Sequence, residues 1–476
     1  MCPRRYRLFA SAVLLVAAFN LTFRLGQEVV TEWDESLYAT SAWEMVQSDQ
    51  WLIPTFHGAV DYYNSKPPLN IWLIALSLKL FGSSLVALRI VSALAAWLTV
   101  LVLMRWTRLQ FGDRESLLAG LVLSTTYAFI YVHAGRSANP DSLLTLFIVL
   151  TIATLSRTRG NPWQRLWLGP LAAGVFMLKG MAVLLPLAIV LTTELLPPRR
   201  RSIRSQPAVG AVLLFIVPVA AWAVARWRVD QWTFLGRLVA YDFVAQMLSP
   251  LEEHAGSVLY YPNILQMYHY DWLAAGLVAA LVVWRGRSQM AGRDVWTLPG
   301  RSSFRLLCVW ATLTLLVPTV MQTKLPWYLN PFYPALAVGI ACLCTLALRI
   351  SRTGLRSGPA HRLVAVAIML AFGVAEGRLV WNSFARRDLN GSAQGVIKGQ
   401  AGQLAGRRVY SAEWSRSEQF VAHALAGAEP IYVNDVETFW RESRAGDYLF
   451  ARQEQADDRL ARVAVNSRAG LYYRLR

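Results

Sequence analysis

The stretch TEWDESLYATSAWEMVQSDQWLIPTFHGAVDYYNSKPPL, residues 31–69, follows an apolar run that ends near Phe23. It places Glu32, Asp34 and Glu35 within four positions, and a Lys66-Pro67-Pro68 corner closes it. An acidic pair in a loop is often simply solvated. Ionisable groups at membrane depth, in contrast, are costly and therefore indicate function. The remainder of the chain decides between these two interpretations.

Composition identifies the class of protein. The chain has 476 residues, 55% of them hydrophobic, and a mean hydropathy of +0.35. Apolar runs recur as far as about residue 381, most of them long enough to cross a bilayer core of roughly 30 Å. The first run follows three arginines, as a signal peptide would, but no small-x-small cleavage site clearly follows it. We therefore interpret it as a retained helix of an all-α polytopic membrane protein.

Eleven runs are predicted to cross the membrane, and 11–13 transmembrane helices are expected in all. Residues 67–81 are apolar but short and contain Lys79. Counting them as a full crossing would invert every later loop, so we interpret them as a helix in the outer interface that begins at two prolines. The predicted spans are 8–23, 85–104, 116–134, 140–155, 164–178, 181–195, 207–225, 271–284, 304–321, 327–348 and 362–381.

Basic residues alternate between the loops. The net charge is +18, which in a soluble protein would suggest nucleic-acid binding. Here 22 Lys and Arg residues fall in the N-terminus and alternate loops, whereas the opposite loops hold eight. This pattern follows the positive-inside rule and predicts a cytoplasmic N-terminus in a bacterial inner membrane. It gives no support to nucleic-acid binding, and the four cysteines offer no disulfide framework.

The C-terminal part of the chain differs in composition. Residues 382–476 are polar, and short β-like runs alternate with helix-like stretches. We predict a transmembrane domain over 1–381, with an outer loop at 24–84, and a small extracytoplasmic α/β domain over 382–476. The β-like runs are 407–412, 430–434, 447–451 and 471–475.

Carboxylates and cations gather on the predicted outer side. Asp141 begins a span behind Arg136, and Lys66, Lys179 and Lys324 stand at outer helix boundaries. A sugar on a polyprenyl phosphate would place its leaving phosphate at this depth. Attack by a hydroxyl on that sugar needs a base, whose help is typically worth 10²–10⁴-fold. It also needs cations where negative charge grows on the departing phosphate.

The same residues carry a resemblance to a known family. The ordered motifs resemble those of the C-type glycosyltransferases (GT-C), nearest to the lipid A aminoarabinose transferases and, beyond them, the protein O-mannosyltransferases. The motifs run over residues 30–335. They are DE-x-x-YA at Asp34, D-x-W-x-x-P at Asp49, KPP at Lys66 followed by FG at Phe81, GRSANPD at 135–141, LKG at 178–180 and KLPWYLNPFYP at 324–334.

The resemblance implies a polyprenyl-phosphate-sugar-dependent glycosyltransferase. Asp34 matches the catalytic aspartate and Asp141 the aspartate of the second loop, while Glu35 is a candidate neighbour of the base. Lys66 matches a lysine that contacts the lipid phosphate. Further candidates for donor binding are Arg136, Lys179, Lys324 and Tyr328.

Two positions depart from the aminoarabinose transferase pattern. Leu37 stands where those enzymes carry an arginine, so phosphate handling and the lipid A acceptor are in question. Ser65 stands where they carry an acidic residue that helps to hold a metal. His254 is a possible ligand or acid–base partner, but no cofactor is assigned, because the departure at Ser65 argues against a bound divalent cation.

Each candidate also has a structural interpretation. Asp34 and Asp141 are placed to cap helices. Lys66 could extend along apolar surface to lipid headgroups. The remaining candidates have structural roles open to them as well: headgroup contact for Arg136, ordinary turn topology for Lys179, interfacial anchoring for Lys324 and Tyr328, and solvation for Glu35 and His254.

Three functions are compatible with these features. The leading hypothesis is an inverting glycosyltransferase that moves a sugar from a polyprenyl-phosphate donor to an envelope glycolipid, lipid A-like molecule, polysaccharide or protein on the periplasmic face. The second is a lipid or solute transporter or flippase, although the predicted spans lack the repeats and mid-span charges typical of one. A structural envelope protein whose C-terminal domain binds a partner is the third.

Overall fold

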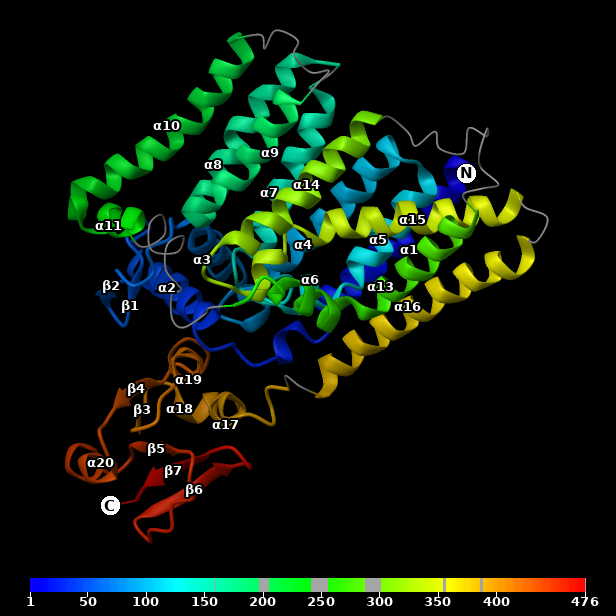
Figure 1. Cartoon of the computed structure of the whole chain (residues 1–476). Coiled ribbons are helices and arrows are strands. Elements are labelled where there is room, and N and C mark those ends of the chain that lie inside the picture. The colour runs from blue at the N-terminus through cyan, green and yellow to red at the C-terminus, as the bar shows by residue number, and fades with distance from the viewer. Residues whose placement is uncertain are drawn as a thin grey trace.

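The computed structural model describes residues 1–158, 160–196, 205–240, 256–286, 301–353, 357–385 and 388–475. Long helices form a bundle, and a small sheet lies at one end of it (Figure 1). The bundle consists of α1 (Pro3–Thr22), α4 (Leu85–Gln110), α5 (Asp113–Ser124), α6 (Tyr127–Tyr131), α7 (Asp141–Arg157), α8 (Leu168–Lys179), α9 (Leu184–Leu195), α10 (Ser205–Asp230), α13 (Tyr260–Gly286), α14 (Arg301–Val320), α15 (Tyr333–Thr353) and α16 (Ser357–Ala385).

Eight helical segments within these described ranges are long and apolar enough to cross a membrane. One of them, Pro162–Leu195, contains both α8 and α9, which are separated by a turn at Gly180 with a φ of +40°. α5 and α7, with 12 and 17 residues, lie at two further predicted spans. The prediction of an all-α multi-pass membrane fold is confirmed.

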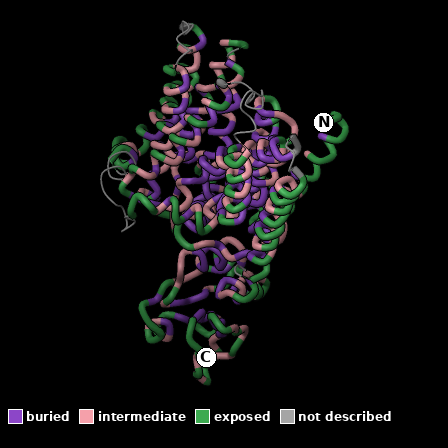
Figure 2. The backbone as a smooth tube through the Cα atoms, turned by 45° about the vertical axis from the view of Figure 1, so that its right-hand side comes forward, coloured by how far each residue is buried: buried purple, intermediate pink, exposed green. Residues whose placement is uncertain are grey.

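The peripheral helices expose apolar side chains. Buried residues fill the middle of the bundle, and exposed residues mark its outer helices (Figure 2). In α10, only 6% of the most hydrophobic window is buried, and Val212, Leu213 and Val217 are more than half exposed. A soluble protein rarely shows so large an apolar surface, whereas lipid covers such a surface at no cost.

One predicted span is broken in the structure. Residues 116–134 form α5 and the short α6, and the chain then leaves the helical path. The hydroxyls of Thr125 and Thr126 donate back to carbonyls in the preceding turn, at 2.9 Å and 2.8 Å, and such bonds often bend helices. The indole N–H of Trp272 donates a hydrogen bond to the Thr125 hydroxyl at 2.9 Å. Residues 132–140 are therefore a loop rather than the end of a helix.

The predicted span 327–348 begins later than expected. Residues Pro326–Leu329 form a 3-10 turn, and α15 starts at Tyr333. Pro331 has no backbone N–H and restricts the residue before it, so a continuous helix through this stretch is disfavoured. The turn leaves Trp327 and Tyr328 outside the bundle helices.

The first loop folds at the end of the bundle that also carries the sheet. It contains α2 (Asp34–Ser48), a hairpin of β1 (Thr55–Phe56) and β2 (Ala59–Val60), and α3 (Leu69–Phe81) (Figure 1). α3 has 13 residues, so at 1.5 Å per residue it spans about 20 Å, less than a bilayer core. α11 (Trp232–Arg237) lies beside this loop.

The C-terminal residues form a five-stranded sheet with the order β4-β3-β5-β7-β6. β3 pairs in parallel with β4 and β5, whereas β7 pairs antiparallel with β5 and β6. Four strands match the predicted runs, whereas β6, with the sequence LARVAV and only partly buried side chains, was not predicted. The elements are α17 (Ala393–Gly399), α18 (Ala401–Leu404), β3 (Arg408–Ser411), α19 (Arg416–Phe420), β4 (Glu429–Tyr432), α20 (Val436–Glu442), β5 (Tyr448–Ala451), β6 (Leu460–Val465) and β7 (Gly470–Arg474).

This C-terminal region packs directly on the first loop. The side chain of Gln394 accepts from the backbone N–H of Val30 at 2.8 Å and donates to its carbonyl at 2.9 Å. The rings of Trp43 on α2 and His423 lie 4.4 Å apart. Apolar residues of α2, α3 and the sheet share one buried cluster. The loop that carries the DE motif is therefore held between the bundle and the sheet.

Candidate active site

Asp34 opens α2 without capping it. The N-cap residue is Trp33, whose φ of +68° is unusual for a residue with a side chain, and no side chain caps this helix end. The Asp34 carboxylate is about one-third exposed. Asp141 likewise is the first residue of α7, behind Pro140, and makes no capping bond. The helix-capping interpretation of both aspartates is therefore wrong.

His133 lies beside Asp34 in the loop created by the broken helix. Its Nδ1 is 3.8 Å from Asp34 Oδ2, and its ring stacks on Trp327 at 3.6 Å with an angle of 7°. The stacking fixes the plane of the imidazole. No sequence signal singled out His133, because it fell inside a predicted span.

Asp141 and Lys179 form an ion pair at 2.8 Å. Lys179 is the last residue of α8, and Gly180 with its positive φ allows the chain to turn immediately after it. The Lys179 ammonium also lies 5.4 Å from the ring centre of Tyr328. Two predicted donor-binding residues, Lys179 and Tyr328, and one predicted acid are thus brought together.

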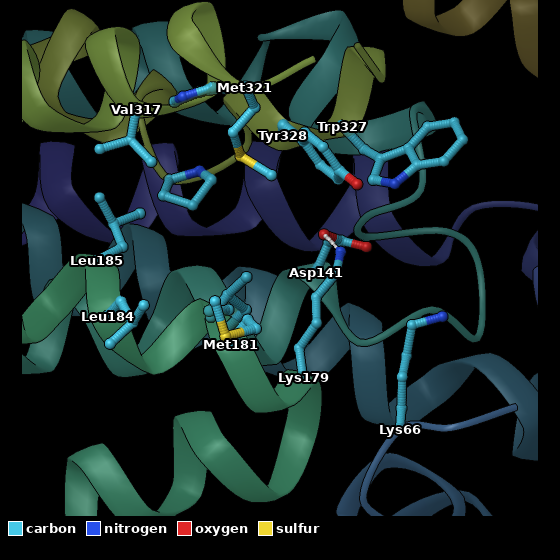
Figure 3. Close-up of a pocket in the computed structure, with 14 residues that line it drawn as sticks. Lys66, Asp141, Lys179, Met181, Leu184, Leu185, Val317, Met321, Trp327 and Tyr328 are labelled. Atoms are coloured by element: carbon cyan, nitrogen blue, oxygen red, sulfur yellow. Dashed lines mark hydrogen bonds and ion pairs between the residues drawn. The ribbon is translucent and has the colours of Figure 1, made fainter. Parts of the chain in front are cut away.

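Lys66 reaches the same region from the loop before α3. Its ammonium lies 5.8 Å from the ring centre of Tyr38, and its charge acts on the Asp34 carboxylate. Lys66, Asp141 and Lys179 approach one pocket from three different elements (Figure 3).

The pocket has one polar end and one apolar wall. The cavity holds about 130 Å³, smaller than a typical small-molecule site, and so has room for a headgroup rather than a whole lipid. Trp327 and Tyr328 lie over the polar end (Figure 3). The apolar wall is formed by residues that include Met181, Leu184, Leu185, Val317 and Met321.

Electrostatics set the charge state of the two central groups. Burial raises the pKa of Asp34, but the charges of Lys66, of Lys179 and of His133 when it is protonated at low pH outweigh that effect. The pKa of Asp34 therefore lies below its ordinary value, and the carboxylate is ionised at neutral pH. Burial lowers the pKa of His133, and its two neighbouring aspartates oppose that shift only in part. The imidazole is therefore neutral at pH 7.

Glu35 does not face the pocket. It is fully buried and accepts hydrogen bonds from Arg89 Nε at 2.7 Å, the Thr31 N–H at 2.7 Å and the Ala138 N–H at 3.1 Å. Glu35 therefore ties α2 to α4 and to the second loop. This contact network positions the neighbouring Asp34.

Arg136 and Lys324 do not line the pocket either, and both donate to backbone carbonyls. Buried Arg136 pairs with Glu28 and donates to the carbonyls of Asn20 at 2.8 Å and Phe23 at 2.7 Å. Lys324 Nζ donates to the carbonyl of Pro318 at 3.1 Å and to two further carbonyls at the end of α14. Both cations hold backbone segments in place, and neither lines the pocket.

No metal centre is assembled in the described part of the chain. No three His, Cys, Asp or Glu side chains gather there closely enough to hold an ion. His254, the candidate ligand, lies outside the described residues.

Comparison with known proteins supports the fold and the family resemblance. Residues 65–224 match the family model described as dolichyl-phosphate-mannose-protein mannosyltransferase. An undecaprenyl phosphate-α-4-amino-4-deoxy-L-arabinose arabinosyl transferase of Pseudomonas fluorescens is 29% identical over 354 residues, which are 71% of this chain and 59% of that protein. One of Edwardsiella ictaluri is 29% identical over 345 residues, which are 70% of this chain and 58% of that protein. The chain thus spans less than two thirds of the length of these relatives.

Solved structures share the fold. ArnT from Cupriavidus metallidurans, bound to undecaprenyl phosphate, has a TM-score of 0.69 at 16% identity and covers 99% of this chain and 98% of that one. An Archaeoglobus fulgidus oligosaccharyltransferase has a TM-score of 0.57 at 11% identity, over 90% of this chain and 65% of that one. In sequence and in fold, the chain is similar to the GT-C glycosyltransferases, with the aminoarabinose transferases among its relatives.

Proposed function

We propose that this chain is a membrane glycosyltransferase that moves a sugar from a polyprenyl-phosphate donor to an envelope acceptor. The observation that carries the proposal is the placement of Asp34 beside His133, whose ring stacks on the pocket residue Trp327, where the charges of the pocket residues Lys66 and Lys179 act on the Asp34 carboxylate. The names of the relatives, which refer to undecaprenyl phosphate carriers, support a donor of this class.

The chemistry is a single displacement at the anomeric carbon. The acceptor oxygen forms a bond to that carbon, and the bond from the carbon to the phosphate oxygen breaks with its electron pair leaving on the phosphate. The acceptor proton passes to the Asp34 carboxylate. Because no covalent intermediate forms, the configuration of the sugar inverts.

Lys66 and Lys179 hold the phosphate in this scheme. Negative charge grows on the leaving phosphate in the transition state, and fixed cations near it stabilise that charge without reorganisation. The apolar wall at Leu184, Leu185 and Val317 suits the first isoprene units of the carrier. Asp141 orients Lys179 through their 2.8 Å ion pair.

The orientation in the membrane follows from the loop charges. The helix ends away from the site adjoin the loops that hold most of the Lys and Arg residues, so that end is cytoplasmic by the positive-inside rule. The site and residues 382–476 then face the periplasm, where a lipid-linked sugar is the available donor. We assign residues 382–476 as an extracytoplasmic domain on this basis.

The test is transfer by Asp34→Asn in isolated membranes. The donor is labelled undecaprenyl phosphate-α-4-amino-4-deoxy-L-arabinose, and the acceptors are total envelope lipids and proteins. We expect a loss of about 10²–10⁴-fold in rate, the usual worth of a general base. Asp49→Asn is the matched control, since Asp49 ends the same helix and its side chain is 75% exposed. Transfer by correctly inserted Asp34→Asn at the control rate would reject the assignment.

A further inference from the structure

An arginine of the C-terminal region sits among aromatic rings of the first loop. The guanidinium carbon of Arg416, the first residue of α19, lies 4.6 Å from the ring centre of Trp33, 5.5 Å from that of Tyr63 and 5.9 Å from that of Phe56. Each distance is within the range of a cation–π contact. Three rings from one part of the chain thus surround a cation from another part, more than 350 residues away in sequence.

The backbone fixes this arginine close to the candidate base. The Glu32 carboxylate accepts hydrogen bonds from the N–H groups of Arg416 and Ser417 at 3.0 Å and 3.2 Å. Glu32 is two residues before Asp34, and Trp33 lies between them. The side chain of Arg416 is therefore anchored beside the loop that presents Asp34.

Polar atoms at this place lack partners within the described residues. Arg416 Nη1 is buried without a hydrogen-bond partner, and so are Asp61 Oδ2 and both polar side-chain atoms of Asn64. Asp61 and Asn64 are only 5% and 4% exposed. Burial raises the pKa of Asp61 even though Arg416 acts against that shift. Buried polar groups are normally hydrogen-bonded, so this group of atoms points to a polar ligand.

The location favours the acceptor over the donor. Lys66, Lys179 and the apolar wall form the pocket suited to a lipid phosphate, and Arg416 is not among the residues that line it. Trp33 and Tyr63, in contrast, are 59% and 52% exposed, so their side chains remain accessible beside Arg416. These side chains suit a ligand that carries a ring, which can stack on an aromatic side chain, and an anionic group, which can accept hydrogen bonds from the guanidinium group of Arg416.

We propose that Arg416, Trp33, Tyr63, Asp61 and Asn64 form the acceptor subsite, and that Arg416 selects a sugar-bearing acceptor with an anionic substituent. This inference rests on the proposed glycosyltransferase function. It makes the C-terminal region a contributor to substrate choice, with Arg416 binding the anionic group while Asp61 and Asn64 bind hydroxyls of the sugar.

The test compares three probes on the full chain in nanodiscs. n-Octyl glucoside 6-phosphate and n-octyl glucoside differ only in the phosphate, and inorganic phosphate lacks the ring. Calorimetry on the wild type should show the phosphorylated glucoside binding at least tenfold more tightly than either other probe. Arg416→Gln should remove that advantage, and Arg416→Lys should restore it in part. Arg441→Gln is the control, because Arg441 is exposed and its side chain donates to the Thr438 hydroxyl of the same helix, α20.

Undecaprenyl phosphate binding separates this proposal from the proposed function. Arg416→Gln should bind undecaprenyl phosphate as the wild type does, whereas a wild type that binds none would count against the glycosyltransferase itself. Trp33→Ala provides a second variant, since it removes an exposed ring without disturbing the Glu32 contacts. Equal binding of all three probes by the wild type would overturn the acceptor subsite. The proposal would also be overturned if Arg416→Gln and Trp33→Ala lost thermal stability but still bound the phosphorylated glucoside more tightly. Arg416 would then only hold the C-terminal region against the first loop.

Discussion

Asp34 Oδ2 lies 3.8 Å from Nδ1 of His133, and the imidazole is held in plane by Trp327. These three residues come from α2, the loop after α6 and the turn before α15. Because the imidazole is neutral, it forms no ion pair with the Asp34 carboxylate. The carboxylate therefore keeps its negative charge and can accept a proton. This relationship makes His133 a positioning residue for the candidate base.

Replacing His133 by Gln should change both the rate and its dependence on pH. We expect about 10²-fold lower transfer, since small displacements of a reacting group have costs of that order. In the wild type, the rate should fall as the pH drops through the lowered pKa of His133, below its ordinary 6.5, because the imidazolium would pair with Asp34 and weaken it as a base. His133→Gln should lack this decline, and a profile identical to that of the wild type would contradict the assignment.

Lys66 should contribute to binding of the lipid phosphate. A hydrogen bond to a charged group is worth about 1.5–3 kcal/mol, so Lys66→Met should weaken undecaprenyl phosphate binding by roughly ten- to hundredfold. Lys79→Met is the control, because Lys79 lies on α3, is about half exposed, and pairs with exposed Asp49 and the Trp51 ring. Titration of the lipid into nanodiscs measures both, and equal losses in the two variants would exclude a specific role for Lys66.

The pair of Asp141 and Lys179 should show strong coupling. Lys179→Met leaves a buried carboxylate without its partner, whereas adding Asp141→Asn removes that charge. The double variant should therefore be more thermally stable than Lys179→Met alone, with a coupling energy of about 0.5–3 kcal/mol. Melting curves in detergent test the cycle, and simple additivity would mean that the pair does not interact. Transfer should be reduced in all three variants.

Glu35 should act on stability more than on chemistry. Glu35→Gln breaks a fully buried ion pair with Arg89, and losing one partner of such a pair typically costs about 3–5 kcal/mol. The double variant Glu35→Leu with Arg89→Met should recover much of this loss, because it leaves no unpaired charge. Thermal unfolding measures both. A catalytic role for Glu35 would instead appear as normal stability with lost transfer.

The sequence predicted the helices better than their interruptions. Hydrophobic runs located the bundle helices, because a membrane segment must be apolar over its whole length. The breaks at Thr125 and Pro331 escaped detection, since each lies inside an apolar run. His133 and Trp327 therefore fell inside the predicted spans 116–134 and 327–348, although His133 lies beside Asp34 and Trp327 stacks on His133.

The positions of the candidate cations in the sequence could not show which of them line the pocket. Lys66 and Lys179 line the pocket, whereas Arg136 and Lys324 do not line it and instead donate to backbone carbonyls. A Lys or Arg at a helix boundary looks the same in sequence in both roles. Only the packing of neighbouring segments decides which carbonyls or carboxylates lie within reach.

The sequence by itself determined that this is a multi-pass helical membrane protein and predicted that its candidate acids and cations lie at helix boundaries on one side, because apolar length and loop charge are local properties of the chain. The tertiary structure alone decided that Asp34 lies beside His133, that Glu35 forms a buried ion pair with Arg89, and that Arg416 contacts the first loop from the C-terminal region. These contacts join residues about 50 to 380 positions apart, and nothing in a linear pattern specifies which distant segments fold against each other.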